Sequence, residues 1–274
     1  LRMARRDESA PRSPIRWLLA LYGEDVIPFQ VGDVEAGRLT RGHRALHGCT
    51  PEISATIEVP KASAYLELIR AAGVILDPEE RRQRILEQAR ALAQAVGGQP
   101  LEEALADELA FLVEQPAAFA GGFDPAFLVL PREALVLVMQ KQQRLFPIVS
   151  PEGALLPRFI GIHDGSPEGV EEARAASEQV LHARLSDLRL SYEQDLRTPL
   201  PARVDALHSI PYQERLGTLF EKTERLGSLV EELCDRWGVD ATTRQIALRA
   251  ALLAKADLAT DLLKELPELR GRIG

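Results

Sequence analysis

Apolar residues recur along the chain with the periods of both strands and helices. Residues 15–21 form an apolar segment that fits a helix or a strand, and residues 26–31 predict a short strand with a proline near its start. Residues 53–59 alternate, with apolar side chains at the odd-numbered positions, which is typical of a half-buried strand. We therefore expect short strands in the first part of the chain.

The clearest helix signal follows these strands. Asp77 can cap a helix, Pro78 occupies the first helical position, and Glu80 has the spacing of a capping box. Apolar residues at helical spacing continue over 85–96 and stop before two glycines. A second helix is expected over 101–112.

The remaining pattern divides the chain in two. Residues 146–149 and 159–162 predict strands on either side of a turn, whereas long helical periodicity follows residue 165. We expect an α+β fold with two domains. Residues 1–165 would form a mixed α and β domain, and residues 166–274 an all-helical one.

The charge distribution restricts the surfaces on which a polyanion could bind. The formal net charge of −8 argues against wholesale electrostatic capture of nucleic acid. The charge is nevertheless +1 over residues 1–70 and +2 over 132–158, against −6 over 71–131 and −5 over 159–274. A polyanion is therefore expected to meet the first and third stretches.

Apolar runs and the chain ends bear on location and completeness. The apolar runs fall far short of the roughly 20 residues needed to cross a bilayer, so a cytoplasmic protein with no membrane contact is expected. The chain starts at Leu1 and ends at Gly274 without a helix-stopping tail, which indicates a piece of a longer protein with missing partners.

Disulfide and metal chemistry are not indicated. Cys49 and Cys234 are far apart and have no CxxC spacing. Residues 252–258 resemble the helix that carries adjacent histidine and aspartate residues in HD-superfamily phosphohydrolases, but here Ala256 precedes Asp257. A lone carboxylate cannot hold a catalytic divalent metal, so an active HD phosphohydrolase is only a rival hypothesis.

The TRGHR segment is the first candidate binding motif. Arg41 and Arg44, with His43 between them, surround a glycine and suit bidentate contact with phosphate or carboxylate. The alternative is a solvated turn in which an arginine pairs with Glu35 or Glu52.

A second cationic group precedes the strand expected at 146–149. Lys141, Gln142 and Arg144 could position a nucleic-acid backbone or contact a base edge. Equally, they could form a polar helix end whose cations complement the helix dipole.

In the helical half, one charge lies beside an apolar stripe. Arg184 has helical spacing from the apolar residues around it and could pair with Asp187 or face a partner. We interpret it as part of a buried structural ion pair, because a buried charge is retained only with a partner.

Eight blocks in sequence order resemble the beta subunit of bacterial heterotetrameric glycyl-tRNA synthetase. They are residues 14–21 (PIRWLLAL), 40–44 (TRGHR), 72–75 with 79–81, 141–147 (KQQRLFP) with 155–160 (LLPRFI), 180–187 (VLHARLSD), 197–200 (RTPL), 212–219 with 221–225, and 252–258 (LLAKADL). The blocks cover almost the whole chain, so the resemblance concerns all of it.

The resemblance implies a fold and a set of partners. It implies an α/β tRNA-binding domain like that of phenylalanyl-tRNA synthetase beta chains, followed by an incomplete, degenerate HD-like helical domain. The chain would bind and position tRNA(Gly) for ATP-dependent aminoacylation by the separate alpha subunit, which uses ATP and Mg²⁺. The remaining domains of the beta subunit would be further partners, and this chain alone would be inactive and need no cofactor or metal.

The resemblance also collects the candidate residues. The tRNA-binding hypothesis covers Arg41, His43, Arg44, Lys141, Gln142, Arg144 and Arg158. Structural or interface candidates are Arg184, Asp187, Lys222, Lys255 and Asp257. A rival interpretation makes the chain a scaffold between domains or subunits, without direct tRNA contacts.

Overall fold

The computed structural model describes residues 15–44, 56–101 and 104–273. Backbone contacts divide the chain into two compact units. The first comprises Leu1–Leu92, Glu102–Phe119 and Ile162–Ala173, and the second Ala93–Leu101, Ala120–Gly161 and Arg174–Gly274. A unit of backbone contacts need not coincide with an independently folding domain, so the boundary expected near residue 165 stays a prediction.

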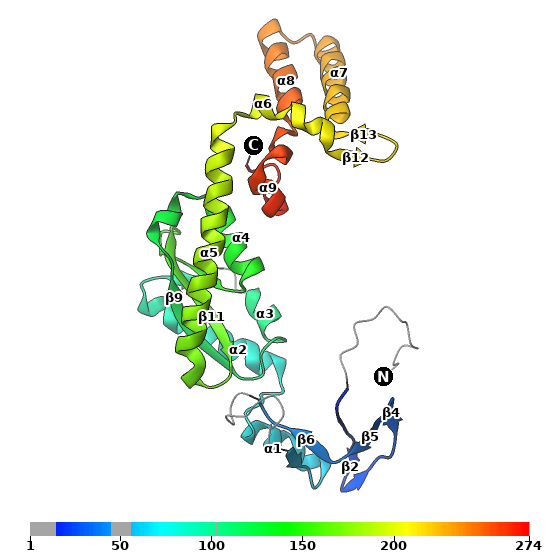
Figure 1. The fold of residues 1–274 in the computed structure, drawn as a ribbon, viewed down its shortest axis with the longest axis vertical. Helices are drawn as coiled ribbons and strands as arrows, with labels where there is room; N and C mark the ends of the chain where they lie inside the picture. The colour runs from blue at the N-terminus through cyan, green and yellow to red at the C-terminus, as the bar shows by residue number, and fades with distance from the viewer. Residues whose placement is uncertain (1–14, 45–55, 102–103, 274) are drawn as a thin grey trace. The chain divides into compact units, whose positions relative to one another are not determined.

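Short paired strands make up much of the first unit (Figure 1). They are β1 (Leu18–Leu19), β2 (Leu21–Tyr22), β3 (Asp25–Val26), β4 (Gln30–Val31), β5 (Val34–Gly37), β6 (Leu39–Arg41) and β7 (Thr56–Glu58). Strand β5 pairs with β1 in parallel and with β4 antiparallel. Strands β2 and β3 form one antiparallel pair, and β6 and β7 form another.

Two strand predictions have different outcomes. The alternation that ends at Val59 is confirmed from Thr56 onward, where exposed and more buried residues alternate and Val59 is fully buried. The part of this pattern before Thr56 lies outside the described residues. A continuous strand over 26–31 is wrong, because Pro28 has no N–H to donate and separates β3 from β4.

Before residue 110 the described residues form the helices η2 (Ala62–Ala64), α1 (Tyr65–Ala71), α2 (Pro78–Ala95) and α3 (Leu105–Leu109). Helix α2 begins where the sequence predicts, and the Asp77 carboxylate accepts a hydrogen bond from the Glu79 N–H at 2.9 Å. The predicted capping box is wrong, because the Glu80 carboxylate accepts two hydrogen bonds from Arg70 instead. The helix expected over 101–112 is shorter in the structure.

A four-stranded sheet follows, with the order β8-β10-β11-β9. Its strands are β8 (Gln99–Pro100), β9 (Pro116–Gly122), β10 (Phe146–Val149) and β11 (Leu155–Asp164). Phe146 pairs with Ile160 across the antiparallel β10–β11 ladder, and both side chains are fully buried. The strand predicted at 146–149 is confirmed, and the one predicted at 159–162 is part of the longer β11.

The helical elements after residue 124 are η3 (Pro125–Val129), α4 (Arg132–Leu137), the π-helical turn η4 (Val138–Gln142), η5 (Pro167–Gly169), α5 (Val170–Arg197), α6 (Leu200–Arg203), η6 (Asp205–Ser209), α7 (Leu219–Trp237), α8 (Ala241–Leu253), η7 (Ala256–Ala259), α9 (Asp261–Glu265) and η8 (Pro267–Leu269). The expectation that residues 166–274 are all helical is wrong in one place. There β12 (Pro211–Gln213) and β13 (Gly217–Thr218) form an antiparallel pair. Gly217 has φ +73°, a conformation that glycine adopts without strain in a tight turn.

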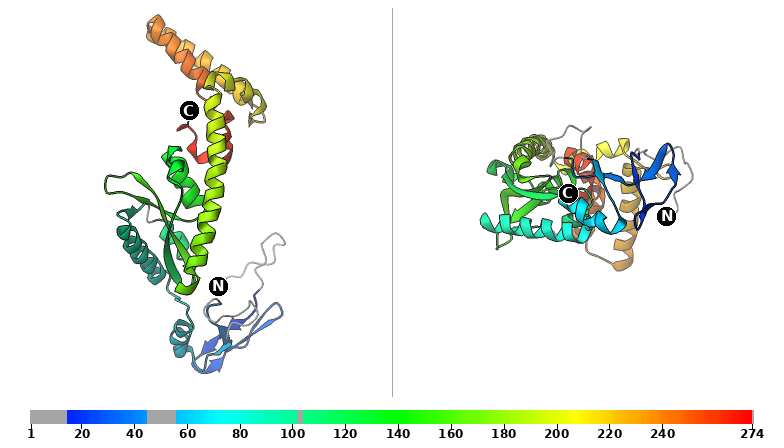
Figure 2. Two further views of the ribbon diagram at one scale, coloured as in Figure 1. Left: turned by 60° about the vertical axis from the view of Figure 1, so that its left-hand side comes forward. Right: turned by 90° about the horizontal axis from the view of Figure 1, so that it is seen from below.

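Helices α7 and α8 form an antiparallel hairpin, drawn in orange in Figures 1 and 2. Thr218 and Glu221 form a capping box at the start of α7, and Gly238 ends the helix in the left-handed conformation. Asp240 then caps α8 by accepting two backbone N–H groups. Within the described residues, no helix has the length and apolar character needed to cross a membrane. The cytoplasmic location stays a prediction.

Candidate functional site

The TRGHR turn lies at the end of β6 and packs closely against the end of α1. The His43 N–H donates to the Ala72 carbonyl at 2.9 Å. A Cβ on Gly42 would lie 2.6 Å from the Ala72 Cβ and 2.7 Å from its carbonyl oxygen. The backbone approach therefore requires glycine at this position and fixes the direction of the residues beside it.

A part-buried hydrogen-bond network holds the same turn from the other side. His43 Nε2 lies 3.0 Å from Asp164 Oδ1, and only 3% of His43 is exposed. The same carboxylate oxygen accepts the backbone N–H groups of Glu114 at 2.8 Å and Gln115 at 2.9 Å. Direct contact of His43 with tRNA stays a prediction, and in this structure its ring is engaged with Asp164. Its side chain positions the turn.

The turn lines a pocket of about 650 Å³, here named the TRGHR pocket. Arg41 is half-buried and its guanidinium lies 5.4 Å from the ring centre of Trp17, while Arg44 is exposed. Tyr65 and Phe111 also line the pocket, and 75% of Phe111 is exposed. With Arg81, three guanidinium groups and the rings of Trp17, Tyr65 and Phe111 thus share one concave surface within the first unit.

The sequence identified Arg41, His43 and Arg44 of this pocket, but not Arg81, the aromatic residues or Asp164. Trp17 belongs to the block PIRWLLAL, so its tryptophan was a usable signal. Asp164 lies 121 positions from His43, and no local pattern points to their contact. Tyr65 and Phe111 look like ordinary apolar positions in the sequence.

The second cationic group lies on the surface of the second unit. Lys141 and Gln142 are exposed at the end of η4, and Arg144 is exposed with φ +53°. Arg158 is exposed on β11 and lines a separate depression together with His182. Residues at the end of η4 do not line this depression.

The interpretation of Arg184 as a buried ion pair is wrong. Arg184 and Asp187 are both exposed on α5, and within the described residues no ion pair joins them. The buried stripe of this helix consists of Leu181, Leu185 and Leu188. Both charged residues fall outside the stripe, where water solvates them.

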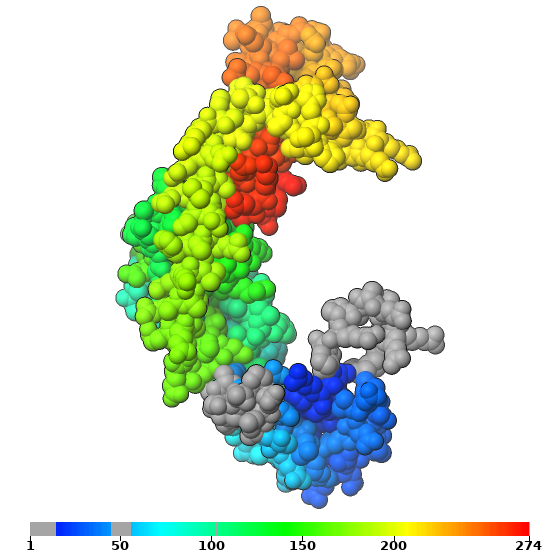
Figure 3. Space-filling model, viewed as in Figure 1, coloured from blue at the N-terminus to red at the C-terminus, as the bar shows by residue number. Residues whose placement is uncertain are grey.

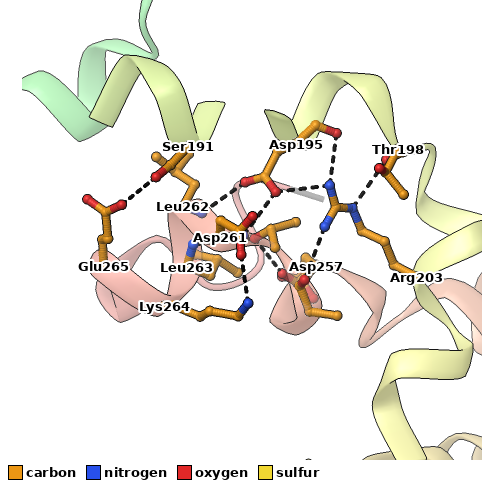
Figure 4. Close-up of polar contacts among 12 residues, drawn as sticks. Ser191, Asp195, Thr198, Arg203, Asp257, Asp261, Leu262, Leu263, Lys264 and Glu265 are labelled. Atoms are coloured by element: carbon orange, nitrogen blue, oxygen red, sulfur yellow. Dashed lines mark hydrogen bonds and ion pairs between the residues drawn. The ribbon is translucent and has the colours of Figure 1, made fainter. Parts of the chain in front are cut away.

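The buried ion pair of the second unit is instead Asp195 with Arg203 (Figure 4). Their side chains are 8% and 10% exposed, and Arg203 Nη2 lies 2.9 Å from Asp195 Oδ1. Arg203 also donates to the carbonyls of Thr198 at 3.2 Å and Ala259 at 3.1 Å. The sequence gives no sign of this pair beyond the arginine and aspartate themselves.

The Asp195 carboxylate also caps the short helix α9, as Figure 4 shows. It accepts the N–H groups of Asp261 at 2.9 Å and Leu262 at 2.8 Å. In Figure 3 the C-terminal segment, in red, accordingly lies against the yellow atoms that follow α5.

Three of the structural candidates meet in one place. Lys222, Lys255 and Asp257 line a pocket of about 440 Å³ in the second unit, here named the lysine pocket. Asp257 is 6% exposed and accepts the Gly271 N–H at 2.9 Å. Sequence reasoning did not select Tyr212 and Arg270, which line the same pocket.

Comparisons with known proteins agree over nearly the whole chain. The family described as "Glycyl-tRNA synthetase beta subunit" matches residues 7–274. The chain is 40% identical over 262 residues to the protein named "Glycine–tRNA ligase beta subunit" of Desulforamulus reducens, 42% identical to that of Moorella thermoacetica and 41% to that of Bacillus subtilis. Each match covers 95% of this chain. The chain spans 37% to 38% of the length of these relatives.

Proposed function

This chain belongs to the glycyl-tRNA synthetase beta subunit family, and we propose that it positions tRNA(Gly) within a glycine–tRNA ligase. The aminoacylation itself, with its ATP and Mg²⁺, would belong to the alpha subunit. The remaining domains of the beta subunit would be the chain's other partners. The observation that carries the proposal is the TRGHR pocket, where guanidinium groups and exposed aromatic rings occur together.

The chemistry of this pocket suits the end of a folded RNA. Guanidinium groups bind phosphate through two parallel hydrogen bonds, and the Arg41 guanidinium lies over the Trp17 ring in this pocket. Aromatic rings such as Phe111 and Tyr65 can stack with unpaired bases. The pocket therefore fits a segment that offers both phosphates and unstacked bases, as the acceptor region of a tRNA does.

The pocket's role would be positional. His43 and Asp164 are engaged with each other and with the backbone, so they fix the turn that carries Arg41 and Arg44. A preorganised contact of this kind holds a reactant in place and contributes to the rate through orientation. Lys141, Gln142, Arg144 and Arg158 remain further candidates for the same RNA, because all four are exposed.

The expected domain types remain part of this proposal. Strands and helices alternate before residue 165, and α5 to η8 follow it with a single short pair of strands, which supports a helical second domain. The block LLAKADL runs from the end of α8 into η7. Asp257 in this block accepts a backbone N–H, which supports a structural use of the carboxylate in an HD-like frame.

A double charge reversal, Arg41→Glu with Arg44→Glu, is expected to weaken tRNA(Gly) binding at least about tenfold, or about 1.4 kcal/mol. The reason is the loss of two phosphate contacts and the introduction of repulsion. The slope of log affinity against log salt should also fall by about 0.7–0.9 for each lost contact. Fluorescence anisotropy of labelled tRNA with the complete beta subunit, at several salt concentrations, measures both quantities.

The matched control is Arg132→Glu with Arg249→Glu. Both arginines are exposed, both lie outside the TRGHR pocket, and the change in net charge is identical. We expect this control to keep most of the affinity and of the salt slope. Equal losses in both double variants would show that only net charge matters, and unchanged binding in the pocket variant would favour the scaffold interpretation.

A further inference from the structure

The lysine pocket gathers basic groups from three separate elements. Lys222 comes from the second turn of α7, Lys255 precedes η7, and Arg270 follows η8. Tyr212 of β12 lines the same pocket. Segments up to 48 residues apart in the sequence thus place three cations around one pocket in an acidic part of the chain.

Several other cations of the second unit have an acidic partner, whereas these three have none among the described residues. Arg236, Arg244 and Lys264 each form an ion pair with a carboxylate. Within the described part of the chain, Lys222, Lys255 and Arg270 form none. Like charges that line one pocket without a carboxylate partner repel one another, so an anion placed between them would be stabilised.

The one carboxylate in the pocket does not neutralise them. Asp257 is 6% exposed, and its Oδ2 accepts the Gly271 N–H at 2.9 Å. This bond ties the carboxylate to the segment that carries Arg270. With three cations and one carboxylate, the lining keeps an excess of positive charge.

The phenol group of Tyr212 also lines the lysine pocket. The Lys222 Nζ lies 3.8 Å from the centre of the Tyr212 ring, which fixes the ring and the ammonium group together. Hydrogen bonding and charge from Lys222 lower the pKa of Tyr212, and the charges of Arg225 and Lys255 act in the same direction. The phenol O–H is therefore held in a positive field and can donate to an anion's oxygen.

We propose that the lysine pocket binds a phosphate group through Lys222, Lys255, Arg270 and the Tyr212 hydroxyl. Its volume of about 440 Å³ is many times the roughly 30 Å³ that a water occupies, so a phosphate fits with some hydration. Phosphate is the favoured anion because its oxygens can accept hydrogen bonds from several cations at once. This inference does not depend on the TRGHR pocket or on the proposed function.

The direct test is calorimetric titration of inorganic phosphate into the chain at constant ionic strength, with chloride as the balancing anion. Saturable binding is expected, and Lys255→Gln with Arg270→Gln should weaken it at least about tenfold through the loss of two charge-assisted contacts. The matched control, Arg236→Gln with Arg249→Gln, neutralises two exposed arginines of the same unit and should bind phosphate normally. Equal affinity in the two double variants would overturn the proposal.

Tyr212 supplies an independent spectroscopic readout. Bound phosphate adds negative charge beside the phenol, so it should raise the lowered pKa of Tyr212 back toward its ordinary value. The difference in ultraviolet absorbance between the chain and its Tyr212→Phe variant isolates this titration. A Tyr212 titration that phosphate leaves unchanged would contradict binding at this pocket.

A second arm distinguishes a free phosphate from a phosphate of an RNA backbone. If the source is RNA, tRNA should bind more weakly to the Lys255→Gln and Arg270→Gln double variant than to the control, and inorganic phosphate should compete with it. If the source is a free phosphate, tRNA affinity should be the same in both double variants while phosphate binding still differs. No difference for either probe would exclude the site.

Discussion

Replacing Asp195 by alanine is expected to lower the free energy of unfolding by about 3–5 kcal/mol. The change leaves the Arg203 guanidinium, whose side chain is 10% exposed, without its carboxylate. It also removes the acceptor of the Asp261 and Leu262 N–H groups at the start of α9. An uncompensated buried charge and two unpaired N–H groups act in the same direction.

The measurement is equilibrium urea unfolding followed by far-ultraviolet circular dichroism. Glu232→Ala is the matched control, because it breaks the exposed pair with Arg236 on α7. Exposed pairs at this spacing contribute about 0.3–0.5 kcal/mol, so the control should hardly move the transition.

A double variant separates the loss of the pair from the cost of leaving one charge behind. Asp195→Ala with Arg203→Met removes both charges, so it should be less destabilised than Asp195→Ala alone. If the two variants unfolded at the same urea concentration, the unpaired arginine would not be the cause. Loss of the α9 cap would then account for the whole effect.

The elements that the sequence predicts well are those with local causes. Helix α2 begins at Pro78 because Asp77 caps it and proline suits its first turn, and these signals lie within three residues. Strand β10 is a short apolar run, and its four residues are all buried in the sheet. Such signals need no knowledge of distant residues.

Contacts between distant residues explain what the sequence did not predict. Glu80 has the correct spacing for a capping box, but Arg70 pairs with its carboxylate across the turn before α2. The spacing around Arg184 suggested a buried charge, but the buried arginine is Arg203. Arg203 follows the end of α5 in the sequence, and it pairs with Asp195 of that helix. Charged side chains carry no periodic signal that says which of them will be buried.

In the candidate sites, too, the local motifs were predictable from the sequence and the contacts between distant residues were not. The TRGHR motif was visible as a string of cations around a glycine, and the structure does place Arg41 and Arg44 on one pocket. Its aromatic wall and the Asp164 contact come from segments far away in the sequence. The lysine pocket was visible only as isolated candidates, because three elements must fold before its cations meet.

Replacing Asp164 by alanine is expected to lower the free energy of unfolding by about 3 kcal/mol, because one carboxylate oxygen accepts three hydrogen bonds. The backbone N–H groups of Glu114 and Gln115 and the buried His43 ring would lose their acceptor together. Asp164→Asn is the matched variant. It keeps an oxygen at this position and should cost less than about 1.5 kcal/mol in the same urea experiment.

The same two variants test whether the fixed turn matters for RNA. Both remove one negative charge from the TRGHR pocket, which by electrostatics alone should strengthen tRNA(Gly) binding equally. If the network positions Arg41 and Arg44, Asp164→Asn should bind at least as tightly as the unchanged subunit, while Asp164→Ala should bind several-fold more weakly. Fluorescence anisotropy of labelled tRNA at one salt concentration measures the affinity of both variants and distinguishes the two explanations. Equal gains in both variants would mean that the guanidinium groups bind RNA without needing a preorganised turn, because charge alone would then account for the affinity.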